Sequence, residues 1–203
     1  MSTDGSRLGI MGGTFDPIHL GHLIVASELR ASLNLDRILL IPNARSPLKN
    51  VSAISSTNDR LSMLHLAVSG IDWLEVSTAE IDRGGVSYTV ETLALLAAHN
   101  PLSTLVFLMG ADSLYDLPRW RRPNEILALA EIGVASRPGI GFDIAGIIAA
   151  LPAAAGRVTT ISTPSIEISA TDIRHRVRAG RPITFQVPAE VERYILTNRL
   201  YFD

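Results

Sequence analysis

The chain alternates short apolar runs with stretches of helical periodicity, and this alternation restricts its fold more than any other feature. Residues 7–11, 37–41 and 105–109 are largely apolar runs of strand length, and each ends at a glycine or a proline. The run at 105–109 is apolar at every position, as expected of a central parallel strand. Strands separated by helices form βαβ units, which build a parallel sheet. We therefore predict an α/β fold with a doubly wound, mostly parallel sheet and helices on both faces.

Weaker patterns complete this order along the chain. Further strand patterns lie at residues 73–76, 132–135 and 158–161. Helical patterns lie at residues 21–33, in the stretch that Ser56 opens, in the stretch that Ser87 or Thr89 opens, and at residues 170–179 and 188–196. No strand signal follows residue 164, and no linker is long enough to divide the chain. We predict one domain over residues 1–203, with a sheet core over 1–164 and a helical C-terminal portion over 165–203.

Composition and charge exclude several classes of protein. The net charge of −2 and the pI of about 6.2 are unlike those of a basic nucleic-acid-binding protein, so we expect no nucleic-acid partner. The chain has no cysteine, which excludes disulfides, thiolate zinc sites and cysteine nucleophiles and fits a cytoplasmic location. Residues 2–7 are polar, unlike a signal peptide, and the apolar stretch at 144–151 stops at Pro152, well short of a spanning helix. We expect no membrane association.

The most informative motif lies between the first strand pattern and the first helix. It reads Gly-Gly-Thr-Phe-Asp-Pro-Ile-His-Leu-Gly-His over residues 12–22. Glycines let the backbone approach a ligand closely, and the free N–H groups at a helix start favour an anion. His19 and His22 are three residues apart across that start, so both rings can face one point. The combination predicts a cradle for phosphate.

Two other interpretations of this motif are weaker. A glycine-rich turn with one buried and one exposed histidine accounts for residues 19–22 but less well for the whole string. A metal site is disfavoured because no third nitrogen or thiolate ligand lies nearby and the i, i+4 helical zinc spacing is absent. We therefore name no metal-ligating residue.

A second motif opens the first helical pattern of the C-terminal portion. Residues 168–174 read Ile-Ser-Ala-Thr-Asp-Ile-Arg, in which Ser169 and Asp172 have the spacing of a capping box. Thr171 in the first turn and Arg174 one turn later add a hydroxyl and a guanidinium, which favour an anion together with the free N–H groups. Because Asp172 partly opposes an anion at this point, an ordinary helix cap is the alternative.

Together the two motifs resemble the signatures of the nucleotidyltransferase superfamily. The first resembles its H-x-G-H motif and the second its I-S-S-T-x-[IV]-R motif, with Ala170 in place of the middle serine. The resemblance implies a Rossmann-like fold in which both signatures bind the phosphates of a nucleotide. The ATP-binding residues that it implies are Gly12, Gly13, Thr14, Phe15, His19, His22, Lys49, Gly110, Asp112, Ser169, Thr171 and Arg174. The implied catalytic residues are His19, His22 and Arg174.

The stretches between the signatures resemble one branch of that superfamily, the bacterial nicotinate-nucleotide adenylyltransferases. These stretches are residues 42–49, 83–93, 109–114 and 117–120, and the tail at 191–201 adds to them. The resemblance covers almost the whole chain and implies ATP and nicotinate mononucleotide as the substrates. The mononucleotide-binding residues that it implies are Lys49, Tyr88, Thr89, Asp112 and Trp120.

Each of these residues also has a role that its position suggests, and a plainer alternative. Asp112 follows a central strand, where its carboxylate can accept two ribose hydroxyls, or it caps a helix. Trp120 stands beside three arginines and can stack on a pyridine ring, or it covers the core. Tyr88 and Thr89 begin a helix whose N–H groups suit a carboxylate, or they only cap it. Lys49 can reach a phosphate as a point charge from its loop, or it is simply solvated.

The implied reaction needs no side-chain nucleophile, since the phosphate of the mononucleotide attacks the α-phosphorus of ATP. His19 and His22 would stabilise phosphate oxygens, and a nearby anion would raise the pKa of each ring. Arg174 and Thr171 would hold the leaving pyrophosphate, and Mg²⁺ would bind mainly through the phosphates of ATP.

Other functions stay open at this stage. A phosphopantetheine adenylyltransferase shares both signatures, but it is usually shorter and has threonine where His19 stands. A cytidylyltransferase would use CTP in place of ATP. A nucleotide-sensing module would keep the phosphate cradle without catalysis. The sequence does not separate nicotinate from nicotinamide mononucleotide, and it leaves the oligomeric state open, a homo-oligomer included.

Overall fold

A computed structural model of the protein describes residues 5–45, 55–136 and 143–202. The strands are β1 (Arg7–Gly13), β2 (Arg37–Pro42), β3 (Leu74–Val76), β4 (Thr104–Gly110), β5 (Glu131–Ser136) and β6 (Val158–Ser162). Within the described residues they form one sheet in the order β3-β2-β1-β4-β5-β6, and every neighbouring pair is parallel. The α/β fold predicted from the alternating pattern is confirmed.

Helices connect the strands and form the C-terminal portion. The helices are α1 (Leu20–Ser32), α2 (Thr57–Val68), α3 (Ala79–Arg83), α4 (Thr89–His99), α5 (Ala111–Asp116), α6 (Pro123–Leu129), α7 (Ile144–Ala150), α8 (Ala170–Arg178) and α9 (Ala189–Thr197), with 3₁₀ turns at η1 (Leu117–Arg119) and η2 (Pro152–Ala154). The sequence patterns miss α3, α5, α6, α7 and both 3₁₀ turns. Each of these has at most seven residues, which is too short for an apolar stripe to repeat along it.

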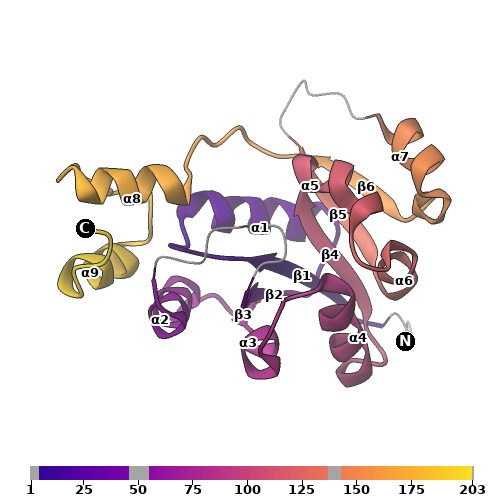
Figure 1. Cartoon of the computed structure of the whole chain (residues 1–203), viewed down its shortest axis with the longest axis horizontal. Coiled ribbons are helices and arrows are strands. Elements are labelled where there is room, and N and C mark those ends of the chain that lie inside the picture. The colour runs from indigo at the N-terminus through magenta and orange to yellow at the C-terminus, as the bar shows by residue number, and fades with distance from the viewer. Residues whose placement is uncertain (1–4, 46–54, 137–142, 203) are drawn as a thin grey trace.

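Both faces of the sheet are apolar, because alternate residues of a central strand point to opposite sides. In β2, Ile38 and Leu40 join a first core layer, whereas Leu39 and Ile41 join a second. Residues of α1, α2, α8 and α9 belong to the first layer, and residues of α4, α6 and α7 to the second. Figure 1 shows α1 and α4 on opposite sides of the sheet. The sheet is therefore doubly wound, as predicted.

The strand order reverses at the centre of the sheet, where β1 and β4 lie side by side. β2 and β3 extend the sheet beyond β1, and β5 and β6 extend it beyond β4. In parallel sheets of this kind, ligands bind outside the carboxyl ends of the strands at the point of reversal. Gly13 at the end of β1 and Gly110 at the end of β4 therefore border the expected site.

The C-terminal helices α8 and α9 lie together at one end of the molecule (Figure 1). Their buried residues Ile173, Val177, Val191 and Ile195 join the first core layer together with residues of β2 and β4. This shared core supports the single domain proposed from the sequence. Among the helices that the structure describes, none is long and apolar enough to cross a membrane.

Candidate active site at the carboxyl edge of the sheet

Two adjoining cavities open at the carboxyl ends of β1 and β4. The first has a volume of about 610 Å³ and the second of about 660 Å³, within the range of small-molecule sites. Their walls share Gly12, Phe107, Ser113 and Trp120. The two cavities therefore meet at the end of β1, where a group bound in one can contact a group bound in the other.

The first cavity lies over the ends of β1 and β2 and the start of α4. Six of the residues predicted to bind a substrate line it: Gly12, Gly13 and Thr14, predicted to bind ATP, and Tyr88, Thr89 and Trp120, predicted to bind the mononucleotide. Asn43, Glu80, Ser87 and Arg121 also line it and were not predicted. Asn43 Nδ2 donates to Thr14 Oγ1 at 3.3 Å, which joins the loops after β1 and β2. The lining combines aromatic rings, hydroxyls and free N–H groups.

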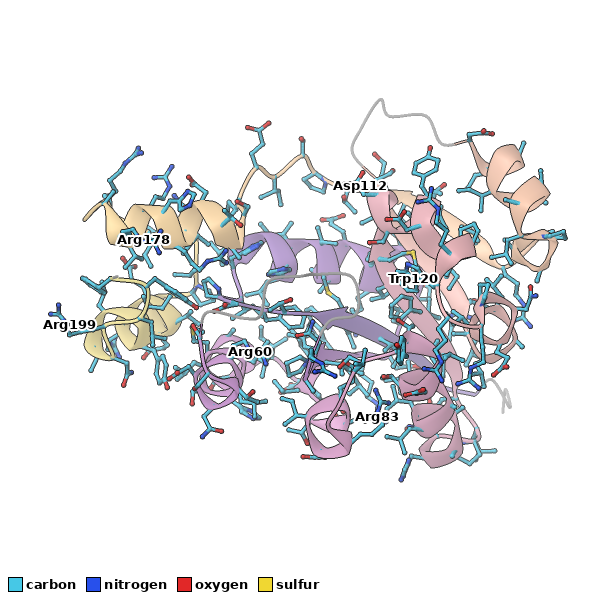
Figure 2. All side chains as sticks on the ribbon, viewed as in Figure 1. Arg60, Arg83, Asp112, Trp120, Arg178 and Arg199 are labelled. Carbon is cyan, nitrogen blue, oxygen red and sulfur yellow. The ribbon has the colours of Figure 1, made fainter. Side chains whose placement is uncertain are left out.

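The second cavity lies over the ends of β1, β4 and β5. Five residues that the sequence predicts to bind ATP line it: Gly12, His19, His22, Gly110 and Asp112. Asp112 is absent from the described wall of the first cavity, so its expected contact with the mononucleotide has no support from this geometry. Ser136 and Thr163 complete the polar lining, and they carry no motif by which the sequence would reveal them. Figure 2 shows Asp112 and Trp120 to the right of the centre of the molecule, well away from Arg178 and Arg199 at its left end.

His19 and His22 stack on each other at the start of α1. Their ring centroids are 3.7 Å apart, with 25° between the planes. The backbone N–H of His19 donates to Nδ1 of His22 at 3.3 Å, which places the proton of a neutral His22 ring on Nε2. His19 is only 7% exposed, and its Nδ1 has no hydrogen-bond partner among the described residues. Both rings line the second cavity, and their convergence on one phosphate stays a prediction.

Burial lowers the pKa of His19 to about 4, because desolvation disfavours the charged ring. The ring is therefore neutral at pH 7 in its protein surroundings alone. An anion against the ring would act in the opposite direction and raise the pKa. The rise in the pKa of His19 that the sequence analysis expects thus depends on the negative charge of a bound phosphate.

Three glycines of the first motif serve different purposes. A Cβ at Gly21 would lie 3.0 Å from Nδ1 of His19, so the missing side chain makes room for that ring. A Cβ at Gly13 would lie 2.9 Å from the ring of Phe15. A Cβ at Gly12 would meet no atom within 4 Å, because Gly12 faces the open space of both cavities. Phe15 itself is 2% exposed and belongs to the core, so only its main chain is available to a phosphate.

The second motif lies beside the first, and Ile168 is the one motif residue that the described wall of the second cavity includes. Ser169 caps α8, since its hydroxyl accepts from the backbone N–H of Asp172 at 3.1 Å. Arg174 donates through Nη2 to Thr171 Oγ1 at 3.3 Å and through Nη1 to the backbone carbonyl of Asp16 at 2.7 Å. The guanidinium therefore reaches the loop between β1 and α1, which carries His19, 158 residues earlier in the chain.

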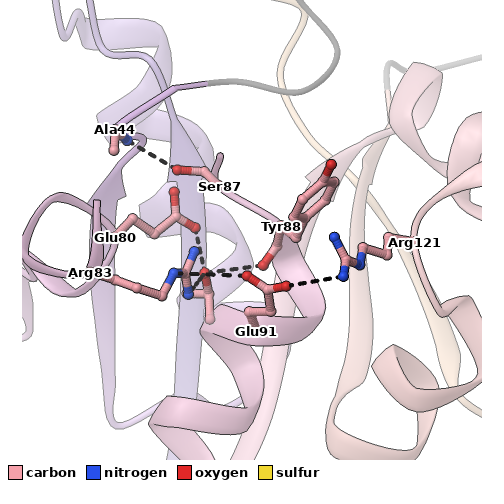
Figure 3. Close-up of polar contacts among 8 residues, drawn as sticks. Ala44, Glu80, Arg83, Ser87, Tyr88, Glu91 and Arg121 are labelled. Atoms are coloured by element: carbon pink, nitrogen blue, oxygen red, sulfur yellow. Dashed lines mark hydrogen bonds and ion pairs between the residues drawn. The ribbon is translucent and has the colours of Figure 1, made fainter. Parts of the chain in front are cut away.

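A polar network supports the start of α4 (Figure 3). The expected caps Ser87 and Thr89 do not cap the helix: its N-cap is Tyr88, and the Ser87 hydroxyl instead accepts from the backbone N–H of Ala44 at 3.0 Å. Thr92, one turn into the helix, donates to the buried Glu80 at 2.6 Å and accepts from Arg83 at 3.3 Å. Ser87 therefore joins the loop after β2 to the helix start, a contact that no local pattern reveals.

Trp120 divides the two cavities rather than belonging to one. Its ring packs edge-on against Phe107, with centroids 6.0 Å apart. Its buried indole N–H has no hydrogen-bond partner among the described residues. Arg121 lies over the ring of Tyr88, 4.4 Å from its centroid, and approaches Glu91 at 3.8 Å. Arg121, one of the three arginines beside Trp120 in the sequence, is thus held at Tyr88, on the side of the first cavity.

Two expectations concern cations. Lys49, which is predicted to reach a phosphate as a point charge, lies outside the described residues. Within the described ranges, no three histidine or carboxylate side chains lie together in a way that would hold a metal ion.

Comparison with known proteins identifies the family. The model of a family described as "Cytidylyltransferase-like" matches residues 10–176. The protein named "Probable nicotinate-nucleotide adenylyltransferase" from Thermomicrobium roseum is 50% identical over 196 residues, which cover 97% of this chain and 92% of that protein. The protein of the same name from Roseiflexus sp. (strain RS-1) is 47% identical over 194 residues, covering 96% and 97%.

A solved structure agrees in fold. The Plasmodium falciparum nicotinic acid mononucleotide adenylyltransferase complexed with NaAD superposes with a TM-score of 0.78 at 18% identity, over 97% of this chain and 98% of that chain. At this identity the likeness concerns the fold alone. The family match and the sequence identity over nearly the whole chain, together with the paired signatures, show that the chain belongs to the nicotinate-nucleotide adenylyltransferases of the cytidylyltransferase-like family.

Proposed function

We infer that the protein transfers the adenylyl group of ATP to nicotinate mononucleotide, giving nicotinate adenine dinucleotide and pyrophosphate. One observation carries this inference: two cavities of nucleotide size meet at Gly12, one beside a stacked histidine pair and the other at a helix start. A reaction that joins two nucleotides needs two such sites in contact. Such a reaction also needs a supply of ATP, which fits the cytoplasmic location expected from the sequence.

The second cavity suits ATP, and the first suits the mononucleotide. His19 and His22 offer ring N–H groups to phosphate oxygens, and Asp112 offers a carboxylate to ribose hydroxyls. In the first cavity, Tyr88 and Thr89 begin α4, whose free N–H groups favour the carboxylate of a nicotinate. Trp120 presents a ring to both cavities, so it can limit the position of each substrate.

Catalysis in this site consists of positioning and electrostatic stabilisation. An oxygen of the mononucleotide phosphate attacks the α-phosphorus of ATP, and the bond to the bridging oxygen breaks as pyrophosphate leaves. His19 and His22 donate to phosphate oxygens on which charge develops. Arg174 and Thr171 hold the leaving pyrophosphate from the start of α8. Mg²⁺ enters with ATP as part of that substrate and neutralises charge on the triphosphate.

The function is tested by pyrophosphate release with ATP, Mg²⁺ and one acceptor at a time. The acceptors are nicotinate mononucleotide, nicotinamide mononucleotide and phosphopantetheine, and CTP replaces ATP in a parallel series. We expect turnover with ATP and nicotinate mononucleotide, at a kcat/KM at least about tenfold above that of the amide. Phosphopantetheine as the preferred acceptor, or binding of ATP without turnover, would contradict the inference.

Two variants test the assignment of the cavities. Tyr88 lines only the first cavity and Asp112 only the second, within the described residues. Tyr88→Ala is expected to raise the KM of the mononucleotide at least about tenfold and to change the KM of ATP by less than about twofold. Asp112→Ala should do the reverse. The opposite pattern, or equal changes in both KM values, would contradict the assignment.

A further inference from the structure

Asp16 is a buried carboxylate inside the first motif that neither cavity exposes. Its residue is 4% exposed, and it lies between Phe15 and the histidine pair in the chain. Tyr201, near the other end of the chain, is 6% exposed and donates its hydroxyl to Asp16 Oδ1 at 2.6 Å. The two residues are 185 positions apart. A buried hydrogen bond to a carboxylate is among the stronger contacts in a protein.

Two further hydrogen bonds connect Asp16 to the segment before α2 and to α8. Its Oδ2 accepts from the backbone N–H of Ser55 at 3.3 Å. Its backbone carbonyl accepts from Arg174 Nη1 at 2.7 Å. Asp16 lies in the loop of residues 14–19 between β1 and α1, which we call the histidine loop because it ends at His19. Asp16 is therefore bound by the C-terminal tail through its side chain and by α8 through its main chain.

A buried arginine holds the same loop from α2. Arg60 is 2% exposed, and Figure 2 shows it beside that helix. Its guanidinium donates to the backbone carbonyls of Thr14 and Asn43, both at 2.9 Å. Its positive charge also attracts the Asp16 carboxylate. The loop thus carries a charged hydrogen-bond acceptor, the Asp16 carboxylate. The Tyr201 hydroxyl is a neutral donor, and its hydrogen bond fixes the orientation of that carboxylate.

The backbone around Tyr201 is held in an unfavourable conformation. Tyr201 has φ of 67° and Arg199 has φ of 52°, both in the left-handed region that bulky residues rarely adopt. Such conformations persist where the surroundings determine them strongly. The Tyr201 ring packs in the first core layer, and this packing aims its hydroxyl at Asp16.

We propose that Tyr201 is a positioning residue for adenylyl transfer: through Asp16 it fixes the histidine loop relative to Arg174. This proposal rests on the proposed function. Tyr201 touches neither cavity within the described residues, so it acts only through the loop. Small displacements of catalytic groups lower the rate of the chemical step more than they weaken binding of substrates in the ground state. The expected signature is a fall in kcat with little change in KM.

The test compares two tyrosine–aspartate pairs in the full-length protein. Tyr201→Phe removes the hydroxyl that binds Asp16. Tyr194→Phe is the matched control, because the Tyr194 hydroxyl, also in the C-terminal portion, donates at 3.0 Å to Oδ1 of Asp59 on α2. Among the described residues, the Asp59 side chain otherwise bonds only to Ser56 and has no hydrogen bond to the loop between β1 and α1. We expect Tyr201→Phe to lower kcat about tenfold to a hundredfold, with the KM of the mononucleotide within about twofold of wild type. Tyr194→Phe should keep kcat within about twofold. An equal loss in both variants, or full kcat in Tyr201→Phe, would overturn the proposal.

A second pair of variants keeps the test valid if Tyr201→Phe does not fold. Asp16→Asn should lower kcat, whereas Asp59→Asn should not. Where all variants fold, Asp16→Asn combined with Tyr201→Phe should cost less than the product of the two separate losses, because one interaction is removed twice. If the double variant lost kcat by the full product of the two separate losses, the proposal would be overturned.

A readout without turnover separates this proposal from the proposed function. The ring ¹⁵N chemical shifts of His19 and His22 should change in Tyr201→Phe and stay unchanged in Tyr194→Phe. If wild-type protein releases no pyrophosphate, the proposed function fails, and these shifts still decide whether Tyr201 positions the loop. Unchanged histidine shifts in Tyr201→Phe would overturn the positioning role even in an active enzyme.

Discussion

At the scale of single residues, absent side chains shape the site as much as present ones do. Gly21 leaves room for the His19 ring, and Gly12 leaves open the space in which the two cavities meet. Gly13, between strand and loop, faces the Phe15 ring instead. A methyl group added at Gly21 or Gly13 would therefore press on a ring of the protein, whereas one added at Gly12 would enter the open space of the cavities.

The clearest case is Gly12→Ala. Its Cβ would meet no protein atom within 4 Å, so we expect the free energy of unfolding to change by less than about 0.5 kcal/mol. The methyl group would stand where both substrates meet, so kcat/KM should fall at least about tenfold for each. Urea unfolding and steady-state kinetics measure the two effects.

Gly13→Ala is the matched control for this substitution. Its Cβ would lie 2.9 Å from the Phe15 ring, so it should destabilise the fold by about 1 to 3 kcal/mol. A Gly12→Ala protein with wild-type kinetics would show that the space at Gly12 is not used by substrates.

The histidine pair should carry a large part of the rate. We expect His19→Ala or His22→Ala to lower kcat at least about 100-fold, a loss of about 2.7 kcal/mol or more of transition-state stabilisation. His65, exposed on α2, is the control, and His65→Ala should leave kcat unchanged. Single-turnover measurements with saturating substrates check this. Retention of most of kcat in His22→Ala would exclude an electrostatic role for that ring.

At the scale of elements, helix α8 positions the second motif through its first turn. Ser169 satisfies the backbone N–H of Asp172, which keeps the turn that carries Thr171 and Arg174 intact. Ser56 makes the equivalent contact at α2, where its hydroxyl accepts from the backbone N–H of Asp59 at 3.1 Å. The two caps are chemically alike, but only the helix that Ser169 caps carries residues predicted to bind ATP, Thr171 and Arg174.

Ser169→Ala and Ser56→Ala should therefore have similar effects on stability and different effects on activity. Each is expected to lower the free energy of unfolding by about 1 kcal/mol. Only Ser169→Ala should also lower kcat/KM for ATP, by about tenfold, because the first turn of α8 loosens around Arg174. Thermal unfolding and kinetics under folded conditions separate the two effects. Equal kinetics in both variants would mean that α8 has only a structural role.

At the scale of the whole molecule, the buried His19 links the site to the pH dependence of folding. Its pKa is lowered to about 4 in the folded protein, whereas an unfolded histidine titrates near 6.5. Between these values the unfolded chain binds a proton that the folded chain does not. The stability contribution is therefore fully present above about pH 6.5 and is lost as the pH falls toward 4.

We expect His19 to account for about 3 kcal/mol of the stability lost between pH 6.5 and 4. Urea unfolding at a series of pH values measures this dependence. His19→Gln should flatten it in that window, because the amide does not titrate. His65→Gln, at an exposed position, should keep the wild-type slope. An unchanged slope in His19→Gln would show that the ring is not buried as a neutral group.

The sequence by itself determined the sheet, the principal helices and the place of both motifs that are predicted to bind an anion, since these depend on local periodicity and spacing. The run at residues 105–109 becomes the central β4, and Ser56 and Ser169 cap the helices they open. The histidine rings stack on one another because they are three positions apart across a helix start.

Only the tertiary structure decided which distant groups meet. No local pattern indicates that Arg60 is buried with its guanidinium on two loop carbonyls, or that Tyr201 binds Asp16 across 185 positions. Likewise, Trp120 joins both cavities only because η1 lies over β4 at Phe107. Burial of a charge and the partner of a hydroxyl depend on packing between elements, and that packing is not encoded in the spacing of any one segment.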